Sequence, residues 1–334
     1  MILTSDRMVQ TSTELIAGIL FLVALVLSAE YIIRKSMRLS EATGFSGTFV
    51  GLTVLSIGTS LPELFTNVVA SIEILTHDLT PEIGSALAVG TSIGSDTFQQ
   101  TIVLGIVALL GTVAVSKEFI RRDIPLMIGT SILVLLFALD GTLSRWNGAV
   151  LFFGYLIYLY ILYQRQREEN MKHQVCMDVR EVLADVFGIM VGLLFLIISA
   201  RELLFIAKDI VTTSGIGASF LGVFVVGAAS ALPELSTALT AVRKKQYGTS
   251  VGILIGSNIT NPAFVTGLGA MISGYILPNA VIFADMPAKI ITGFFVYLFL
   301  RNLRLSKKEG FSLIAIYFIY LVLRMRYFPL DVFT

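Results

Sequence analysis

The stretch that decides the fold is LSIGTSLPELFTNVVA at residues 55–70, because a similar stretch, VGAASALPELSTALTA, recurs at residues 226–241. Over the last fifteen residues of each, six positions are identical, and four of them form an uninterrupted Leu-Pro-Glu-Leu run. A second pair follows the first: GTSIGSDTFQQTIVLG begins at Gly90 and GILIGSNITNPAFVTG begins at Gly252. Two unrelated leucine-rich helices do not usually share prolines, glutamates, glycines and serines, so the pattern indicates an internal duplication.

The duplicated stretches lie in a strongly apolar chain. Of its 334 residues 55% are apolar and 14% are charged, whereas a soluble domain is about 25% charged. This composition makes an ordinary soluble enzyme an unfavourable interpretation and favours a protein of the lipid bilayer. The net charge of +1 gives no electrostatic reason to expect nucleic acid, and a single cysteine excludes an internal disulfide. We expect no cofactor, and nothing in the sequence predicts an oligomeric state.

Apolar runs follow one another along the chain, and they predict an all-α integral membrane protein with ten transmembrane helices. The predicted spans are 13–33, 46–74, 83–113, 124–140, 147–163, 181–205, 216–242, 249–274, 278–300 and 310–327. The only long polar joint, 164–180, separates five spans from five. The first unit is therefore 1–163 with its motif at 58–99, and the second is 181–334 with its motif at 229–261.

An odd number of spans in each half fixes how the halves relate. The second copy must enter the bilayer from the opposite side, so we expect two inverted five-helix repeats whose equivalent residues meet near the midplane. The joints on one side of these spans hold 17 Lys and Arg residues, and those on the other side hold 6. This excess predicts a multi-pass protein of the cell membrane with the central linker in the cytoplasm and both termini outside.

Glu63 and Glu234 lie near the middle of their predicted spans. A charged carboxylate at the centre of a membrane helix costs about 2.5–3.5 kcal/mol, so it needs a proton, a basic partner or a bound cation. The four repeated segments contain no Lys or Arg, which favours a cation or a proton. Pro62 and Pro233 cannot donate backbone hydrogen bonds, so each leaves a carbonyl one turn earlier without its helical partner.

The neighbouring side chains offer oxygen rather than sulfur or imidazole. Ser95 and Gln99 are four residues apart, as are Ser257 and Asn261, which places each pair on one face of its helix. Calcium binds about 6–8 oxygens at 2.3–2.6 Å, and two carboxylates cancel its charge. The same oxygens suit sodium or protons, and competition for one set of ligands is enough to couple their movements.

At these residues the chain resembles the cation/calcium exchanger superfamily, most closely its sodium/calcium exchangers. The resemblance is carried by GTSLPE at 58–63 with GSDTFQ at 94–99, and by ASALPE at 229–234 with GSNITN at 256–261. It implies an antiporter rather than an enzyme, with Ca²⁺ and Na⁺ as transported ligands. It further implies exchange of about three sodium ions for one calcium ion, as a two-helix gate slides against an eight-helix core.

The resemblance also implies individual roles. Glu63 and Glu234 become the central calcium ligands, and carbonyls or hydroxyls of Thr59 and Ser230 complete their shell. The flanking sodium sites are implied at Ser60, Ser95 and Ser257, with carbonyls near Ser56 and Gly227. The central amide positions fall to Gln99 and Asn261.

Some positions depart from the family pattern. Asp96 replaces an Asn and adds a third acid, which is a ligand, a proton carrier or the partner of a neighbouring helix. The interval from Glu63 to Ser95 is nine residues longer than its counterpart in the second half, and we expect an outside loop around 77–82. A proton/calcium antiporter, or one for another divalent cation, is therefore an alternative. A passive cation channel and a membrane enzyme are more remote alternatives.

Overall fold

The computed structural model describes residues 16–32, 34–35, 55–111, 113–115, 117, 119–169, 179–243 and 247–333. Short π-helical segments, labelled η, continue the α-helices next to them. The helical elements are α3 (Ser56–Thr59), α4 (Leu61–Leu75), α5 (Pro81–Phe98), η2 (Gln99–Val103), α6 (Leu104–Leu110), η3 (Phe119–Asp123), α7 (Ile124–Phe137), α8 (Arg145–Glu169), α9 (Val179–Ser214), α10 (Ala218–Leu221), η4 (Gly222–Val226), α11 (Gly227–Ser230), α12 (Leu232–Arg243), α13 (Tyr247–Thr260), η5 (Asn261–Val265), α14 (Thr266–Ser273), η6 (Val281–Asp285), α15 (Met286–Leu300) and α16 (Lys307–Tyr327). An apolar helix also covers Ile16–Ile32.

Seven of the described helices are long and apolar enough to cross a membrane. They are Pro81–Leu110, Arg145–Gln164, Arg180–Ser214, Ala218–Arg243, Ser250–Ser273, Val281–Leu300 and Lys307–Tyr327. The predicted multi-pass membrane protein is therefore confirmed in its class. The sequence prediction ended the sixth span at residue 205, but α9 continues to Ser214. The charged residues Arg201, Glu202 and Lys208 break the apolar run without breaking the helix, because all three are good helix formers.

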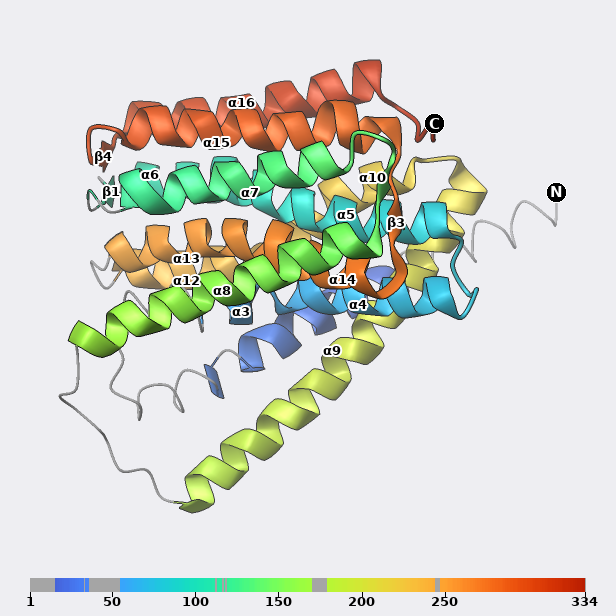
Figure 1. Cartoon of the computed structure of the whole chain (residues 1–334), viewed down its shortest axis with the longest axis horizontal. Coiled ribbons are helices and arrows are strands. Elements are labelled where there is room, and N and C mark those ends of the chain that lie inside the picture. The colour runs from blue at the N-terminus through green and yellow to red at the C-terminus, as the bar shows by residue number, and fades with distance from the viewer. Residues whose placement is uncertain are drawn as a thin grey trace.

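The prediction of a purely helical chain misses two small antiparallel strand pairs. β1 (Val113–Ala114) pairs with β4 (Arg304–Leu305), and β2 (Thr142–Leu143) pairs with β3 (Tyr275–Ile276). Each pair joins a connection in the first half of the chain to one in the second half. The connections are extended there, and strand pairing satisfies their backbone hydrogen-bonding groups. Figure 1 shows β1 and β4 at one end of the helices and β3 towards the other.

The predicted outside loop around 77–82 is wrong in its extent. The connection between α4 and α5 occupies only residues 76–80. Most of the extra residues of the first half lengthen α4 and α5 instead, which run for 15 and 18 residues against 12 and 14 in α12 and α13. Pro81 at the start of α5 and the Thr80 side chain that caps it fix the beginning of that helix.

Two helical segments, one in each half of the chain, are interrupted at equivalent positions. The first copy is interrupted at Ser60, between α3 and α4, and the second at Ala231, between α11 and α12. A proline stands two residues later in each copy, at Pro62 and Pro233, where the first turn of the new helix tolerates it. The breaks place the beginnings of α4 and α12 inside the protein.

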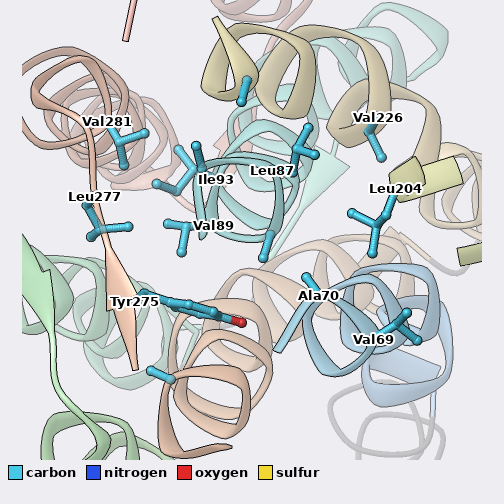
Figure 2. Packing of buried hydrophobic residues seen from close by; sticks show 14 of the residues in the cluster. Val69, Ala70, Leu87, Val89, Ile93, Leu204, Val226, Tyr275, Leu277 and Val281 are labelled. Carbon is cyan, nitrogen blue, oxygen red and sulfur yellow. The ribbon is translucent and has the colours of Figure 1, made fainter. Parts of the chain in front are cut away.

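Helix α5 lies at the centre of the molecule. Figure 2 shows its residues Leu87, Val89 and Ile93 surrounded by apolar side chains from other elements, among them Val226 and Val281. Its glycines allow close contact with η4. A Cβ at Gly94 would overlap the backbone of Val223. The backbones of α5 and η4, from the two halves of the chain, therefore touch, which is typical of small residues between membrane helices.

Candidate cation site

Glu63 and Glu234 are each the third residue of the helix that follows a break. Both side chains are completely buried, with an exposed fraction of 0%. The positive end of each helix dipole stabilises a negative charge in this first turn. Each helix break therefore places a carboxylate in a first turn, where the helix dipole offsets part of the cost of burying its charge.

The two carboxylates are held by hydroxyls from both halves. Ser230 donates to Oε1 of Glu63 at 2.8 Å, and Ser257 donates to Oε1 of Glu234 at 3.1 Å. Thr59 also interacts with Glu234, and the two glutamates are near enough for their charges to interact. The predicted meeting of Glu63 and Glu234 is therefore what the structure shows.

Further hydroxyls and an amide join the elements around the acids. The Ser60 and Ser257 hydroxyls are 2.8 Å apart, and Gln99 Nε2 donates to Ser95 at 3.0 Å and to Ser257 at 3.3 Å. Ser95 also interacts with Glu63. In this arrangement the amide nitrogen of Gln99, rather than its oxygen, faces the serines. A direct ligand role for Gln99 stays a prediction that requires its amide to turn.

The backbone carbonyls predicted as ligands, those of Ser56 and Gly227, lie seven residues before the acids, on the other side of each helix break. The carbonyl of Ser56 accepts a hydrogen bond from Thr59 at 3.3 Å, and that of Gly227 accepts one from Ser230 at 3.0 Å. The Ser56 hydroxyl is 2.8 Å from that of Thr260 and so faces another neighbour. The sodium roles of Ser56 and Gly227 remain predictions.

Three oxygens around the site are buried and accept no hydrogen bond from the described residues: Oε2 of Glu63, Oε2 of Glu234 and Oδ1 of Asn261. A buried polar oxygen without a partner is costly. No ion pair in the described part of the chain reaches Glu63 or Glu234. The donor chemistry fits a hard cation, which prefers carboxylate, amide and hydroxyl oxygens.

The described residues contain no group of three or more His, Cys, Asp or Glu side chains arranged to hold a metal ion. The candidate site therefore consists of two carboxylates supplemented by neutral oxygens. With both glutamates ionised, such a site has two negative charges to balance.

Of the three roles that the sequence left open for Asp96, the structure shows the third, in which Asp96 pairs with a residue of a neighbouring helix. Lys289 of α15 places Nζ 2.5 Å from Oδ2 of Asp96, and Asn261 donates to Oδ1 at 2.8 Å. Both oxygens are thus engaged, so a direct ligand role for Asp96 stays a prediction. The sequence contained the signal for this pair, because a lysine inside an apolar span also requires a partner.

The sequence reasoning missed a chain of amides behind the site. Asn258 donates to Oε1 of Gln99 at 3.1 Å, Gln100 donates to Oδ1 of Asn258 at 2.8 Å, and Thr292 donates to Oε1 of Gln100 at 2.5 Å. These hydrogen bonds connect the site to α15. Their signal was the presence of amides within apolar spans, where an unpaired amide is costly.

The fold and the site together define a multi-pass membrane protein with a buried centre rich in carboxylate, hydroxyl and amide oxygens. The family model described as sodium/calcium exchanger protein matches residues 13–164 and 185–326. The chain belongs to this family, as the sequence motifs predicted, and is therefore a cation/calcium antiporter by class rather than an enzyme.

Relatives and a solved structure agree with this membership. Inner membrane protein YrbG of Escherichia coli is 31% identical over 284 residues, covering 82% of this chain and 83% of that protein. The putative antiporter CaxA of Alkalimonas amylolytica is 27% identical, covering 88% and 92%. Sodium/calcium exchanger MaX1 of Methanosarcina acetivorans is 23% identical, covering 91% and 96%. A structure of the sodium-calcium exchanger NCX_Mj has the same fold, with a TM-score of 0.65, 24% identity, and coverage of 93% of this chain and 99% of that one.

Proposed function

We propose that this protein exports calcium in exchange for sodium, by alternating access to the site around Glu63 and Glu234. The observation that carries the proposal is that, among the described residues, each of these buried acids has an oxygen without a hydrogen-bond partner and neither acid forms an ion pair. Calcium balances both charges, and sodium ions that occupy the same oxygens compete with it. Two relatives support the choice of ions: MaX1 is a sodium/calcium exchanger, and NCX_Mj was soaked with Na⁺ and with Ca²⁺ or Sr²⁺.

A proton/calcium antiporter is the second candidate. It is favoured by the orientation of Gln99, whose amide nitrogen occupies hydroxyl partners that a sodium ion needs. Protons require no such ligands, because they bind the carboxylates of Glu63 and Glu234 directly. The same site then alternates between one calcium ion and protons.

The mechanism we propose uses two inverted five-helix repeats, 1–163 and 181–334, joined by the linker 164–180. The equivalent helix breaks support it, and so do the strand pairs. β1 in the first half is equivalent to β3 in the second, and β2 is equivalent to β4. The pair β1–β4 therefore has an equivalent pair, β3–β2, and the structure contains both. The contacts of the acids are similar under the same equivalence, because Ser230 of the second half donates to Glu63 and Thr59 of the first half lies near Glu234. Beyond the seven long helices and Ile16–Ile32, α3 with α4 and η3 with α7 take the places of the two further spans.

We further propose that the helix Ile16–Ile32 and α9 form the sliding gate. They pack on each other, since a Cβ at Gly192 would lie 2.7 Å from the Ile32 side chain. Lys35 and Asp185 join them with an ion pair of 2.7 Å. Figure 1 shows α9 running obliquely to most of the other helices.

The orientation we propose has both termini outside and the linker 164–180 in the cytoplasm. The distribution of basic residues supports it. Two of the residues counted on the outer side form ion pairs within the protein: Arg201 pairs with Glu73 at 2.7 Å, and the buried Arg324 pairs with Asp285 at 2.9 Å.

Calcium flux in proteoliposomes tests the function. Vesicles that contain the purified protein and calcium receive a sodium gradient or a pH gradient, each imposed alone. We expect calcium movement driven by the sodium gradient and little by the pH gradient. Movement driven by the pH gradient alone would select the proton antiporter, and calcium leak with no counter-ion would exclude both antiporters.

A further inference from the structure

The pair formed by Asp96 and Lys289 lies beside the site and has no assigned part in it. Both side chains are buried, with exposed fractions of 0% and 4%, and their charged atoms are 2.5 Å apart. Asn261 connects the pair to the site, since its nitrogen donates to Asp96 while its oxygen is one of the three without a partner. The charge of Asp96 also acts on Glu63.

The other half of the chain has a neutral pair at the equivalent positions. The alignment that matches Ser95 with Ser257 also matches Asp96 with Asn258 and Lys289 with Met127. The local structure agrees, because η3 and η6 precede the two helices and a threonine three residues later bonds the carbonyl of each residue. These bonds are 3.0 Å from Thr130 to Met127 and 2.9 Å from Thr292 to Lys289. The fold therefore accommodates Asn and Met where it here contains Asp and Lys.

This comparison argues against a purely structural reason for the ion pair. A buried ion pair is often no more stabilising than uncharged residues of similar size, and at the bilayer centre each charge is expensive to insert. Unlike Asn and Met, the pair is neutral only while Lys289 is present, because Lys289 cancels the charge that Asp96 places next to the site. Without Lys289, the three acids Glu63, Glu234 and Asp96 carry a charge of −3. With Lys289 present, the net charge is −2.

We propose that the Lys289 ammonium acts as a built-in monovalent cation, which lowers by one the number of monovalent ions exchanged for each calcium ion. This inference rests on the proposed antiport. With Lys289 present, the site and its neighbour carry a net charge of −2, which one calcium ion or two monovalent ions neutralise. Exchange is then two for one and electroneutral. The charge of the pair is zero whichever partner holds the proton, so the count does not depend on how they share it.

The substitution Lys289→Met copies the residue of the other half and exposes the charge of Asp96. Three monovalent ions then neutralise the site, whereas one calcium ion leaves a charge of −1. Each cycle moves one net charge across the membrane. Asp96→Asn together with Lys289→Met reproduces the full neutral pair and returns the net charge to −2. Lys308→Met, at an exposed lysine of α16, is the matched control.

The experiment uses proteoliposomes with fixed sodium and proton gradients, with or without a membrane potential set by thiocyanate diffusion. It measures the ratio of internal to external calcium concentration at which net calcium flux stops. For one net charge per cycle, about 100 mV shifts this ratio about fifty-fold, and for electroneutral exchange it shifts nothing. We expect no shift for the unmodified protein, the Lys308→Met control and the double variant, and a fifty-fold shift for Lys289→Met. This ratio is an equilibrium quantity, so a slow variant still reports it.

A fifty-fold shift in the unmodified protein would overturn the inference, whatever the variants do. An unshifted ratio in a Lys289→Met variant that transports calcium would overturn it too. If Lys289→Met does not fold, the unmodified protein and the double variant decide, because both must be electroneutral. Absence of any exchange in the unmodified protein would instead refute the proposed antiport. Repeating the measurement with only sodium or only protons present identifies the monovalent ion.

Discussion

At the scale of single residues, the protein concentrates its chemistry in a few oxygens. Glu63 and Glu234 combine complete burial, a helix N-terminus and one hydroxyl partner each, and both retain an unsatisfied oxygen. The free energy needed to bury these charges is recovered only when a cation or proton arrives. This makes the acids sensitive to substitutions that change charge but not shape.

Replacing Glu63 by Gln tests this at one residue. The amide keeps the size of the side chain but removes half of the negative charge offered to calcium, so we expect calcium exchange to fall by at least about 100-fold, the loss of about 3 kcal/mol of binding. Insertion and thermal stability should change little, because a neutral side chain is easier to bury. Flux in proteoliposomes measures the first, and size-exclusion profiles in detergent the second. Glu181→Gln, at an exposed residue of α9, should transport normally. Transport by Glu63→Gln at the normal rate would remove Glu63 from the site.

At the scale of elements, the two repeats depend on helices that approach unusually closely. The contact of α5 with η4 and α11 uses glycines on both sides, and a Cβ at Gly227 would lie 2.7 Å from the carbonyl oxygen of Thr91. This contact fixes Ser95 relative to Ser230, and so it sets the width of the site.

Gly94→Ala should therefore destabilise the protein although it adds only a methyl group. The methyl would meet the backbone of Val223, which cannot rotate away as a side chain does, so we expect a loss of about 1–3 kcal/mol or more. Thermal unfolding in detergent measures it. Gly129→Ala in α7 is the control, because no atom lies within 4 Å of its added Cβ, and there the better helix propensity of alanine should stabilise slightly. Equal melting temperatures for the two variants would contradict a tight contact at Gly94.

The sequence predicts much of this arrangement because its strongest signals are local. Pro62 and Pro233 predict the breaks, and the spacing of Ser257 and Asn261 predicts one helix face. The sequence does not predict which side chains meet when the two residues are far apart along the chain. Lys289 is 193 positions from Asp96, and no local rule joins them. The strand pairs, each only two residues long, and the charged continuation of α9 are likewise decided by tertiary contacts rather than by hydropathy.

At the scale of the whole molecule, the site is where the two halves are joined. The Ser230 hydroxyl of the second half bonds Glu63 of the first, and the Asn261 side chain of the second half bonds Asp96 of the first. An ion in this position therefore contacts both halves at once. Its binding energy adds to the stability of the complete fold.

Calcium should accordingly raise the melting temperature of the protein. A ligand that binds only the folded state at 100 times its dissociation constant stabilises by about 2.7 kcal/mol. Thermal unfolding with calcium, with magnesium and with a chelator makes the comparison. We expect a shift with calcium, a smaller one with magnesium because it dehydrates reluctantly, and none with calcium in the Glu63→Gln variant. Identical unfolding curves with calcium and chelator would argue against a calcium site that bridges the halves.

The strand pairs β1–β4 and β2–β3 have a consequence for how the chain is made. During synthesis the first half leaves β1 and β2 with bare hydrogen-bonding edges, which stay unsatisfied until residues 275–276 and 304–305 have emerged. Neither half therefore forms these strand pairs by itself, and a chain that ends before residue 275 contains two unpaired strands. The two strand pairs can therefore form only after the chain has been synthesised up to residue 305, just before α16.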